Sequence, residues 1–188
     1  MDIKEIYAYR EMIFSLVRRD LKGKYKNSLI GFMWTFLNPL FQLLIYTFAF
    51  SVVMPINVEN YYMHLFVALI PWIFFSACLT GGARAVTDQQ EMVKKIYFPR
   101  EVLPISFATS QFVNMLLSFL VIFVVLLLSG IGINLQAIVW LPIVFLIQYV
   151  LALGITMACS AISVYYRDME QIFGILSLGL MYACPVVY

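Results

Sequence analysis

Five long apolar segments follow one another along the chain, with shorter and more polar connections between them. They cover residues 32–53, 65–83, 105–129, 137–164 and 172–188. A helix needs about 20 mostly apolar residues to cross a bilayer, and in lipid it satisfies its backbone hydrogen bonds within itself. The pattern therefore predicts an all-α membrane protein with five transmembrane helices in this chain, built as a single domain over residues 1–188.

Residues 1–29 show a different pattern, in which apolar and basic positions recur with a helical period. The apolar positions share one side of the predicted helix: Ile6, Ile13, Val17 and Leu21. The basic positions form an i, i+4 row on another side: Arg18, Lys22 and Lys26. This pattern predicts an amphipathic helix that lies in the headgroup layer of the membrane. Its role is open between a plain anchor that faces anionic lipid and a collar that meets an anionic substrate head group.

In the collar role, the residues that recognise the substrate head group are Arg18, Arg19, Lys22 and Lys24. Their long side chains carry the positive charge that an anionic group requires.

The connection between the second and third segments is rich in charge. Thr87 and Gln90 have the spacing of a capping box at a helix start. Acidic residues then fall in the first turn and basic residues in the last, as the helix dipole favours: Asp88, Glu91, Lys94 and Lys95. Pro99 ends the helix, because the residue before a proline avoids the α region. The sequence predicts one helix between residues 87 and 97, ~15 Å long, which is either an ordinary interfacial element or a plug for a groove on another protein.

Composition supports the membrane assignment, since 63% of the residues are hydrophobic and 12% are charged. Soluble domains carry about 25% charged residues. All 12 Lys and Arg residues precede the first segment or lie in the connections after the second and the fourth. These regions share one side of the membrane, and the positive-inside rule predicts that this side, with the N-terminus, is cytoplasmic.

Missing residue types disfavour two classes of membrane protein. No Asp, Glu or Lys occupies the middle of an apolar segment, whereas ion-coupled transporters and membrane enzymes usually need such groups. The sequence has no GxxxxGK(S/T) phosphate-binding loop, and its single His64 and scattered cysteines form no metal motif. The chain is therefore expected to be a conduit powered from outside, without catalytic residues, a metal ion or a bound cofactor.

Neutral polar side chains recur at helical spacing in the third segment, where Ser110 is followed by Gln111, Asn114 and Ser118. They either hydrogen-bond neighbouring helices or line a pathway that accepts sugar hydroxyls. Aromatic residues such as Tyr46 and Phe50 are likewise either lipid-facing filler or surfaces on which a passing glycan stacks. Both pairs of alternatives are open at this point.

Three stretches of sequence carry a family resemblance: RRDLKGKYKNSLIGFMWTFLNPL (residues 18–40), KKIYFPREVLP (94–104) and YYRDMEQI (165–172). In this order they resemble the basic N-terminal pattern, the connection after the second transmembrane helix and the Arg-Asp turn before the fifth in ABC-2 type permeases. The resemblance is to the permeases that export polysaccharides, such as O-antigen, capsular polysaccharide and teichoic acid. The matching stretches are spread over most of the chain.

The resemblance implies how such an exporter is assembled and driven. The short helix is then a coupling helix that inserts into a cleft of a separate nucleotide-binding subunit, which holds ATP and Mg²⁺. Two copies of the permease form a homodimeric pore, and each complete protomer has six transmembrane helices. Because this chain is still apolar at Tyr188, we expect it to be C-terminally truncated. The implied coupling residues are Thr87, Asp88, Gln90, Glu91, Met92, Lys94, Lys95, Tyr97 and Arg100.

The implied cargo is a lipid-linked polysaccharide that crosses the cytoplasmic (inner) membrane of a bacterium. Membrane lipids are expected as neighbours, and nucleic acid is not. The nearest rival is an ABC-2 exporter of drugs or lipids, which shares the architecture. A membrane-embedded glycosyl- or phosphotransferase is a rival of another class, and a structural scaffold is a third.

Overall fold

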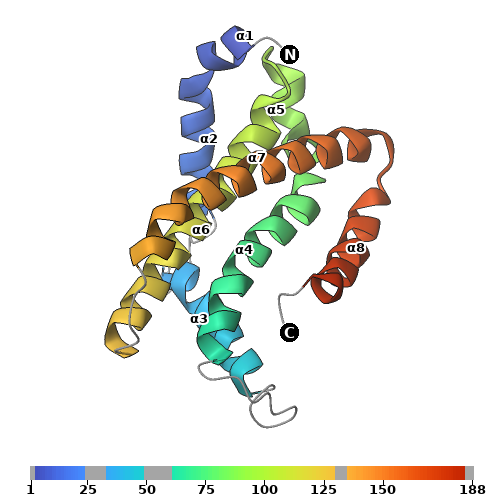
Figure 1. Ribbon diagram of the computed structural model, residues 1–188. Coiled ribbons are helices and arrows are strands. Elements are labelled where there is room, and N and C mark those ends of the chain that lie inside the picture. The colour runs from blue at the N-terminus through green and yellow to red at the C-terminus, as the bar shows by residue number, and fades with distance from the viewer. Residues whose placement is uncertain (1–2, 24–32, 49–60, 130–134, 185–188) are drawn as a thin grey trace.

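The computed structural model describes residues 3–23, 33–48, 61–129 and 135–184, and within these ranges every regular element is a helix. The predicted all-α class is therefore confirmed for the described part of the chain (Figure 1). The elements are α1 (Ile3–Ala8), α2 (Arg10–Gly23), α3 (Trp34–Phe48), α4 (Tyr61–Gly82), the 3₁₀ turn η3 (Thr87–Gln89), α5 (Gln90–Lys95), α6 (Val102–Ser129), α7 (Leu135–Tyr165) and α8 (Met169–Ala183).

Three of the described helices are long and apolar enough to cross a membrane. The qualifying stretches are Leu65–Gly82 in α4, Val102–Val124 in α6 and Ile138–Tyr165 in α7, and they match the second, third and fourth predicted segments. Helices α3 and α8 fall in the first and fifth segments but have 15 residues each. Residues 32, 49–53 and 185–188 of those segments lie outside the described ranges. Five membrane spans therefore remain a prediction.

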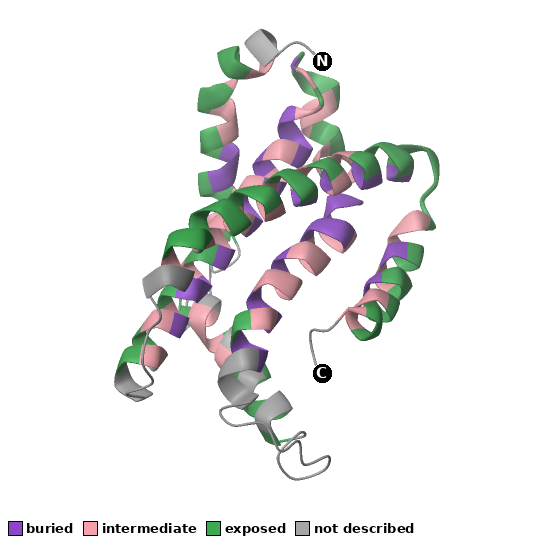
Figure 2. Cartoon of the chain, in the orientation of Figure 1, coloured by how far each residue is buried: buried purple, intermediate pink, exposed green. Residues whose placement is uncertain are grey.

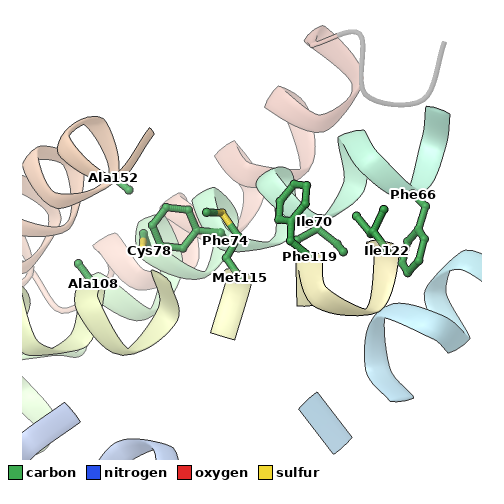
Figure 3. Close-up of a cluster of buried hydrophobic side chains, with 9 residues drawn as sticks. All are labelled: Phe66, Ile70, Phe74, Cys78, Ala108, Met115, Phe119, Ile122 and Ala152. Atoms are coloured by element: carbon green, nitrogen blue, oxygen red, sulfur yellow. The ribbon is translucent and has the colours of Figure 1, made fainter. Parts of the chain in front are cut away.

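Helix α4 packs against α3, α6, α7 and α8. Its inward side chains recur every four residues, so they form one stripe along the helix: Phe66, Ile70, Phe74 and Cys78. Facing residues of α6 and α7 complete the largest buried cluster (Figure 3): Ala108, Met115, Phe119, Ile122 and Ala152. In lipid, such helices associate through close packing and interhelical hydrogen bonds and not through the exclusion of water.

Close approach at the end of α4 depends on two adjacent glycines. A Cβ atom at Gly81 would clash with the ring of Phe107 on α6, and one at Gly82 would lie 3.1 Å from Cα of Thr156 on α7. A side chain at Gly81 would displace the Phe107 ring, and one at Gly82 would crowd the backbone of α7. The Gly-Gly pair thus permits close packing at the end of α4 where the charged connection begins.

Side-chain hydrogen bonds to neighbouring helices tie α7 to the bundle. Gln148 Nε2 on α7 donates to the carbonyl oxygen of Pro71 on α4 at 2.8 Å. The hydroxyls of Thr109 on α6 and Tyr149 on α7 lie 2.8 Å apart. The opposite side of α7 is exposed along its length (Figure 2), with Leu146 and Val150 more than half exposed. An apolar exposed face of this kind suits contact with lipid.

Candidate functional site

The charged connection (residues 84–101) leaves α4 through consecutive tight turns. The backbone N–H of Arg84 donates to the carbonyl of Gly81 at 3.1 Å, and that of Asp88 donates to the carbonyl of Arg84 at 2.9 Å. The hydroxyl of Thr87 also donates to the carbonyl of Arg84, at 3.2 Å. The predicted capping box is therefore wrong. Thr87 already lies inside a turn that continues from α4, so its hydroxyl bonds backward and caps no helix.

The predicted single helix is also shorter than expected. It is divided into the 3₁₀ turn η3 and the six-residue α5, and neither has a side-chain cap. Ile96 adopts an extended conformation with φ −129° and ψ 134°, so α5 ends at Lys95. Pro99 does not set this end, because the chain leaves the helical region three residues before it.

The side chains beyond α5 point in opposite directions. Tyr97 is 96% exposed, whereas Phe98 is 7% exposed and lies in a cluster with Leu16, Val102 and Leu103. Partly buried residues from α2 and the residue before it, from α5 and from the turn before η3 surround this cluster: Tyr9, Met12, Ile13, Val86, Met92 and Val93. The segment after α5 therefore presents Tyr97 outward, with Ile96 also exposed, and turns Phe98 toward this cluster.

Helix α2 therefore supports the charged connection from behind. Leu16 and Val17 of α2 are buried, and Ile13 is partly buried on the same side. The apolar side predicted for lipid is covered in part by α6 and by the charged connection. The reason is non-local: the start of α6 offers Val102 and Leu103 as an apolar partner, which the pattern of residues 1–29 cannot reveal.

The predicted coupling residues divide between two surroundings. Most are exposed: Asp88, Gln90, Glu91, Lys94, Lys95, Tyr97 and Arg100. Of these, Asp88 lines a cavity against α2 and α6. Gln90, Lys94 and Arg100 line a second cavity, of about 620 Å³, against α7. Thr87 and Met92 are half-buried, and Met92 packs on the cluster with Phe98. Lys95 and Glu91 form an i, i+4 ion pair at 3.8 Å, which is too exposed to contribute much stability. Glu91, Lys95 and Tyr97 line neither cavity, and they form the outer side of the connection that is free to meet another protein.

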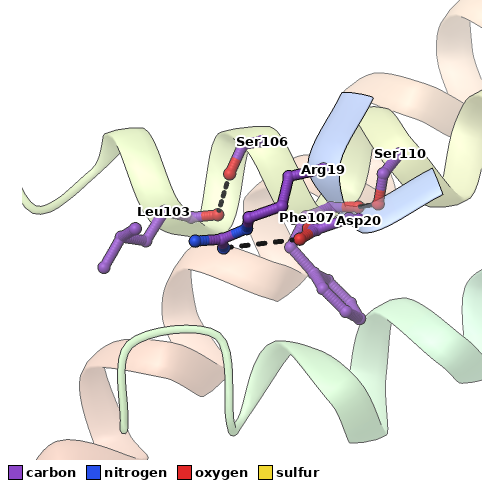
Figure 4. A network of polar contacts seen from close by, with 6 residues as sticks. All are labelled: Arg19, Asp20, Leu103, Ser106, Phe107 and Ser110. Carbon is purple, nitrogen blue, oxygen red and sulfur yellow. Dashed lines mark hydrogen bonds and ion pairs between the residues drawn. The ribbon is translucent and has the colours of Figure 1, made fainter. Parts of the chain in front are cut away.

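A cavity of about 510 Å³ lies between the end of α2, the end of α4, the charged connection and the first half of α6. We call it the polar cavity. Its polar lining residues come from three separate parts of the sequence, which are α2, the charged connection and α6: Arg19, Asp20, Asp88, Gln89, Ser106, Ser110, Gln111 and Asn114. Figure 4 shows Arg19 and Asp20 of α2 beside Ser106, Phe107 and Ser110 of α6.

Local contacts satisfy several polar groups of this cavity. Ser106 and Ser110 each donate to the carbonyl three residues earlier, Leu103 and Phe107, at 2.8 Å. Each hydroxyl oxygen still has capacity to accept a hydrogen bond. Arg19 lies 3.4 Å from Asp20 in an ion pair. These bonds hold the serine side chains in place and leave their hydroxyl oxygens able to accept a hydrogen bond from a ligand or water.

Asn114 is the exception. Its side-chain oxygen and nitrogen are both buried and have no hydrogen-bond partner. A buried amide without partners destabilises a fold by about 1–3 kcal/mol. An unsatisfied amide in the wall of a polar cavity is expected where a polar ligand or water completes the hydrogen bonds.

The structure brings together residues that the sequence placed in separate groups. Arg19, predicted for the substrate head, lines the same cavity as Gln111 and Asn114, predicted for the pathway. Arg18 and Lys22 are exposed and do not line it. Ser118 is buried outside the cavity and donates to the carbonyl of Asn114 within the same helix at 3.0 Å. Lys24 and Phe50 lie outside the described residues, and of Tyr46 only the backbone, in α3, is described.

Comparison with known proteins identifies the family. Residues 11–188 match the family model described as ABC-2 type transporter. The chain belongs to the ABC-2 type transporter family. It is 38% identical over 186 residues to the O-antigen export system permease protein RfbA of Myxococcus xanthus, covering 99% of this chain and 71% of the relative. It is 30% identical over 181 residues to O-antigen export system permease proteins RfbA of Klebsiella pneumoniae, covering 95% of this chain and 69% of those relatives.

Sequence reasoning missed several residues of this ABC-2 chain that the structure makes prominent. Asp20 and Ser106 line the polar cavity, Gly81 allows Phe107 to form its wall, and Arg84 pairs with Glu170 of α8. The Gly-Gly pair was a visible signal of close packing. The partner of Arg84 had no local signal, because it belongs to another helix. The described residues contain no group of three or more His, Cys, Asp or Glu side chains that would hold a metal ion.

Proposed function

We propose that this chain is the membrane-spanning permease subunit of an ATP-driven exporter that moves a lipid-linked polysaccharide across the bacterial inner membrane. The observation that carries the proposal is the 38% identity over 99% of the chain to an O-antigen export system permease. That alignment includes both the charged connection and the polar cavity. The apolar lengths of α4, α6 and α7 support the membrane location.

The charged connection is the proposed contact with a separate ATPase subunit, which holds ATP and Mg²⁺. Its outer side carries exposed charges around Tyr97, an aromatic residue of the kind that dominates protein interfaces. Its inner side is joined to α2 and α6 through Phe98. A displacement of Tyr97 by the bound subunit should therefore move the start of α6 as well as the connection itself.

The polar cavity is the proposed site of the substrate head group. Arg19 supplies a planar, permanently charged donor for a phosphate oxygen. Asp20 and Asp88 repel phosphate but accept hydrogen bonds from sugar hydroxyls, so they favour a head that carries both groups. Asn114 can donate to one hydroxyl and accept from another.

The proposal includes an orientation and a second copy of the chain. The N-terminus and the charged connection face the cytoplasm, because the basic residues gather in these parts of the sequence. Five spans in this chain and a homodimeric pore complete the arrangement. The exposed apolar faces of α7 and α8 leave surface for both lipid and a second protomer.

Reconstitution tests the function directly. The permease and its ATPase subunit are placed in proteoliposomes with a lipid-linked polysaccharide, and transfer across the bilayer is measured with and without ATP. We expect transfer that requires both ATP and the ATPase subunit. Transfer without the ATPase subunit, or transport of a drug or phospholipid in place of the polysaccharide, would contradict the proposal.

Adjacent arginines provide a matched pair of variants for the head-group site. Arg19→Gln should lower transfer about tenfold, because it removes the charge that lines the polar cavity. Arg18→Gln makes the same change at an exposed neighbour outside the cavity and should lower transfer about twofold at most. Equal effects of the two variants would remove the cavity from the proposal and leave only a diffuse basic surface.

A further inference from the structure

Arg84 lies where three parts of the molecule meet. It follows the last turn of α4, and its own N–H donates to the carbonyl of Gly81 in that turn. Its carbonyl accepts from the N–H of Asp88 and the hydroxyl of Thr87, at 2.9 and 3.2 Å. Its guanidinium forms an ion pair with Glu170 in the first turn of α8. One residue thus joins α4, the charged connection and α8.

Helices α4 and α8 lie side by side and antiparallel, with the end of α4 next to the start of α8 (Figure 1). A second polar contact lies farther along both helices, where the hydroxyls of Ser76 and Ser177 are 2.7 Å apart. Between the two polar contacts, Leu79 of α4 and Ala83, the residue after its end, pack in a buried cluster with Phe173 of α8. We call this interface the α4–α8 seam.

The two ends of the seam have different surroundings. Ser177 is buried, so the far end is fixed by packing as well as by its hydrogen bond. At the near end, the Arg84 and Glu170 side chains are 57% and 34% exposed, so their ion pair is accessible to water. The outer side of α8 is open, since Ile175 is 73% exposed and Leu178 is 61% exposed. Helix α8 therefore follows α4 at one end through a contact that can be altered without disrupting the core.

We propose that the Arg84–Glu170 ion pair transmits movement of the charged connection to α8 during transport. The inference rests on the proposed function, because it assumes that an ATPase moves the charged connection. When that connection shifts, the hydrogen bonds at the Arg84 carbonyl move the end of α4, and the ion pair moves the start of α8 with it. Arg84 and Glu170 are positioning residues in this role, and they touch neither substrate nor ATP.

A charge exchange tests the proposal in the complete permease–ATPase complex. The variants are Arg84→Glu, Glu170→Arg and both together, and the readout is polysaccharide transferred per ATP hydrolysed. We expect each single variant to lower this ratio about fivefold, because the loss of one exposed ion pair shifts an equilibrium by about that factor. The ATPase subunit should still co-purify. The double variant, with its charges exchanged, should restore the ratio to within about twofold of the unaltered protein.

Gln171→Arg is the matched control. It introduces an arginine in the same turn of α8 at an exposed position, one residue from Glu170. We expect it to leave the transfer-to-hydrolysis ratio within about twofold. A merely structural role would lower the amount of complex, and transfer and hydrolysis would fall together.

Each outcome decides the proposal. Unchanged ratios in both single variants would overturn it, as would a stable double variant that stays uncoupled. If the exchanged variants fail to accumulate, Arg84→Gln and Glu170→Gln replace them. Their combination should then be no worse than either alone, and additive losses would overturn the proposal. If the unaltered complex shows no ATP-dependent transfer, the proposed function itself fails. If the unaltered complex transfers polysaccharide and the variants couple equally well, only the role of the ion pair fails.

Discussion

Asn114 is the residue whose chemistry is least satisfied by the fold itself. Its amide is buried without a partner on the wall of the polar cavity, whereas Ser110 beside it donates to the carbonyl of Phe107. Ser118, one turn later on α6, is also buried but donates to a backbone carbonyl. These two polar residues of the same predicted face thus differ in their hydrogen bonds. Ser118 bonds a carbonyl of its own helix, whereas the amide of Asn114 is available to a ligand.

Replacing Asn114 with leucine separates these two roles. Asn114→Leu keeps a side chain branched at Cγ and removes the unpaired amide, so the free energy of unfolding should rise by about 1 kcal/mol. Polysaccharide transfer should nevertheless fall about threefold to tenfold, because hydrogen bonds to the substrate are lost. Melting temperature in detergent and transfer in proteoliposomes measure the two effects.

Ser118→Ala is the control for this variant. It removes a hydroxyl that lies outside the polar cavity, so a small loss of stability with normal transfer is expected. If Asn114→Leu lowered stability and left transfer intact, the amide would be a structural group and the cavity would lose its proposed ligand.

At the scale of the elements, the charged connection and α2 form one unit. Phe98 and the start of α6 bind the inner side of this unit, and the outer side presents Tyr97. Helix α5 has only six residues, and a helix of that length is not stable alone in water. Contact with α2 through this cluster therefore stabilises so short a helix, as the proposed docking role requires.

Removing the aromatic ring at the tip of this unit should weaken the contact with the ATPase. Tyr97→Ala is expected to lower the affinity for the ATPase subunit about tenfold or more, since truncating a central interface tyrosine typically costs about 2 kcal/mol. The permease should insert and fold normally, because Tyr97 is 96% exposed. Co-purification with the ATPase and titration of ATPase activity in detergent measure the change.

Tyr7→Ala tests whether any exposed tyrosine near this end has the same effect. Tyr7 is 66% exposed on α1 and lies beneath the guanidinium of Arg10, 4.8 Å from the ring centre. Its removal should leave ATPase affinity within about twofold. Equal affinity of the Tyr97→Ala variant and the unaltered protein would show that the ATPase binds elsewhere.

The sequence predicted what depends on local composition and missed what depends on long-range contacts. The spans in α4, α6 and α7 follow from runs of apolar residues, which lipid requires of any crossing helix. The capping box failed because the turn out of α4 already engages Thr87. The polar cavity could not be derived, since it forms only when α2 folds against α6 and brings Arg19 near Asn114.

At the scale of the whole molecule, the arrangement of helices places the functional features at one end. Helix α4 ends and α6 begins at the charged connection, and α8 begins beside the end of α4 through the Arg84–Glu170 pair (Figure 1). Helix α2 packs on the first turns of α6, so its basic residues belong to the same end. The polar cavity opens among these elements. Substrate entry and ATPase docking therefore share one side of the membrane in the proposed mechanism.

The shared side can be identified by labelling introduced cysteines. Gln90→Cys places a thiol at an exposed position of the charged connection, and Asn134→Cys places one in the sequence between the third and fourth apolar segments. Both are made after the native cysteines, Cys78, Cys159 and Cys184, are replaced by alanine. The positive-inside rule predicts that a membrane-impermeant maleimide labels Gln90→Cys in inside-out vesicles and Asn134→Cys in intact spheroplasts. The opposite labelling pattern would mean that the charged connection faces away from the cytoplasm. A cytoplasmic ATPase could then not reach it, and ATP hydrolysis could not move α4, α6 or α8 through this connection.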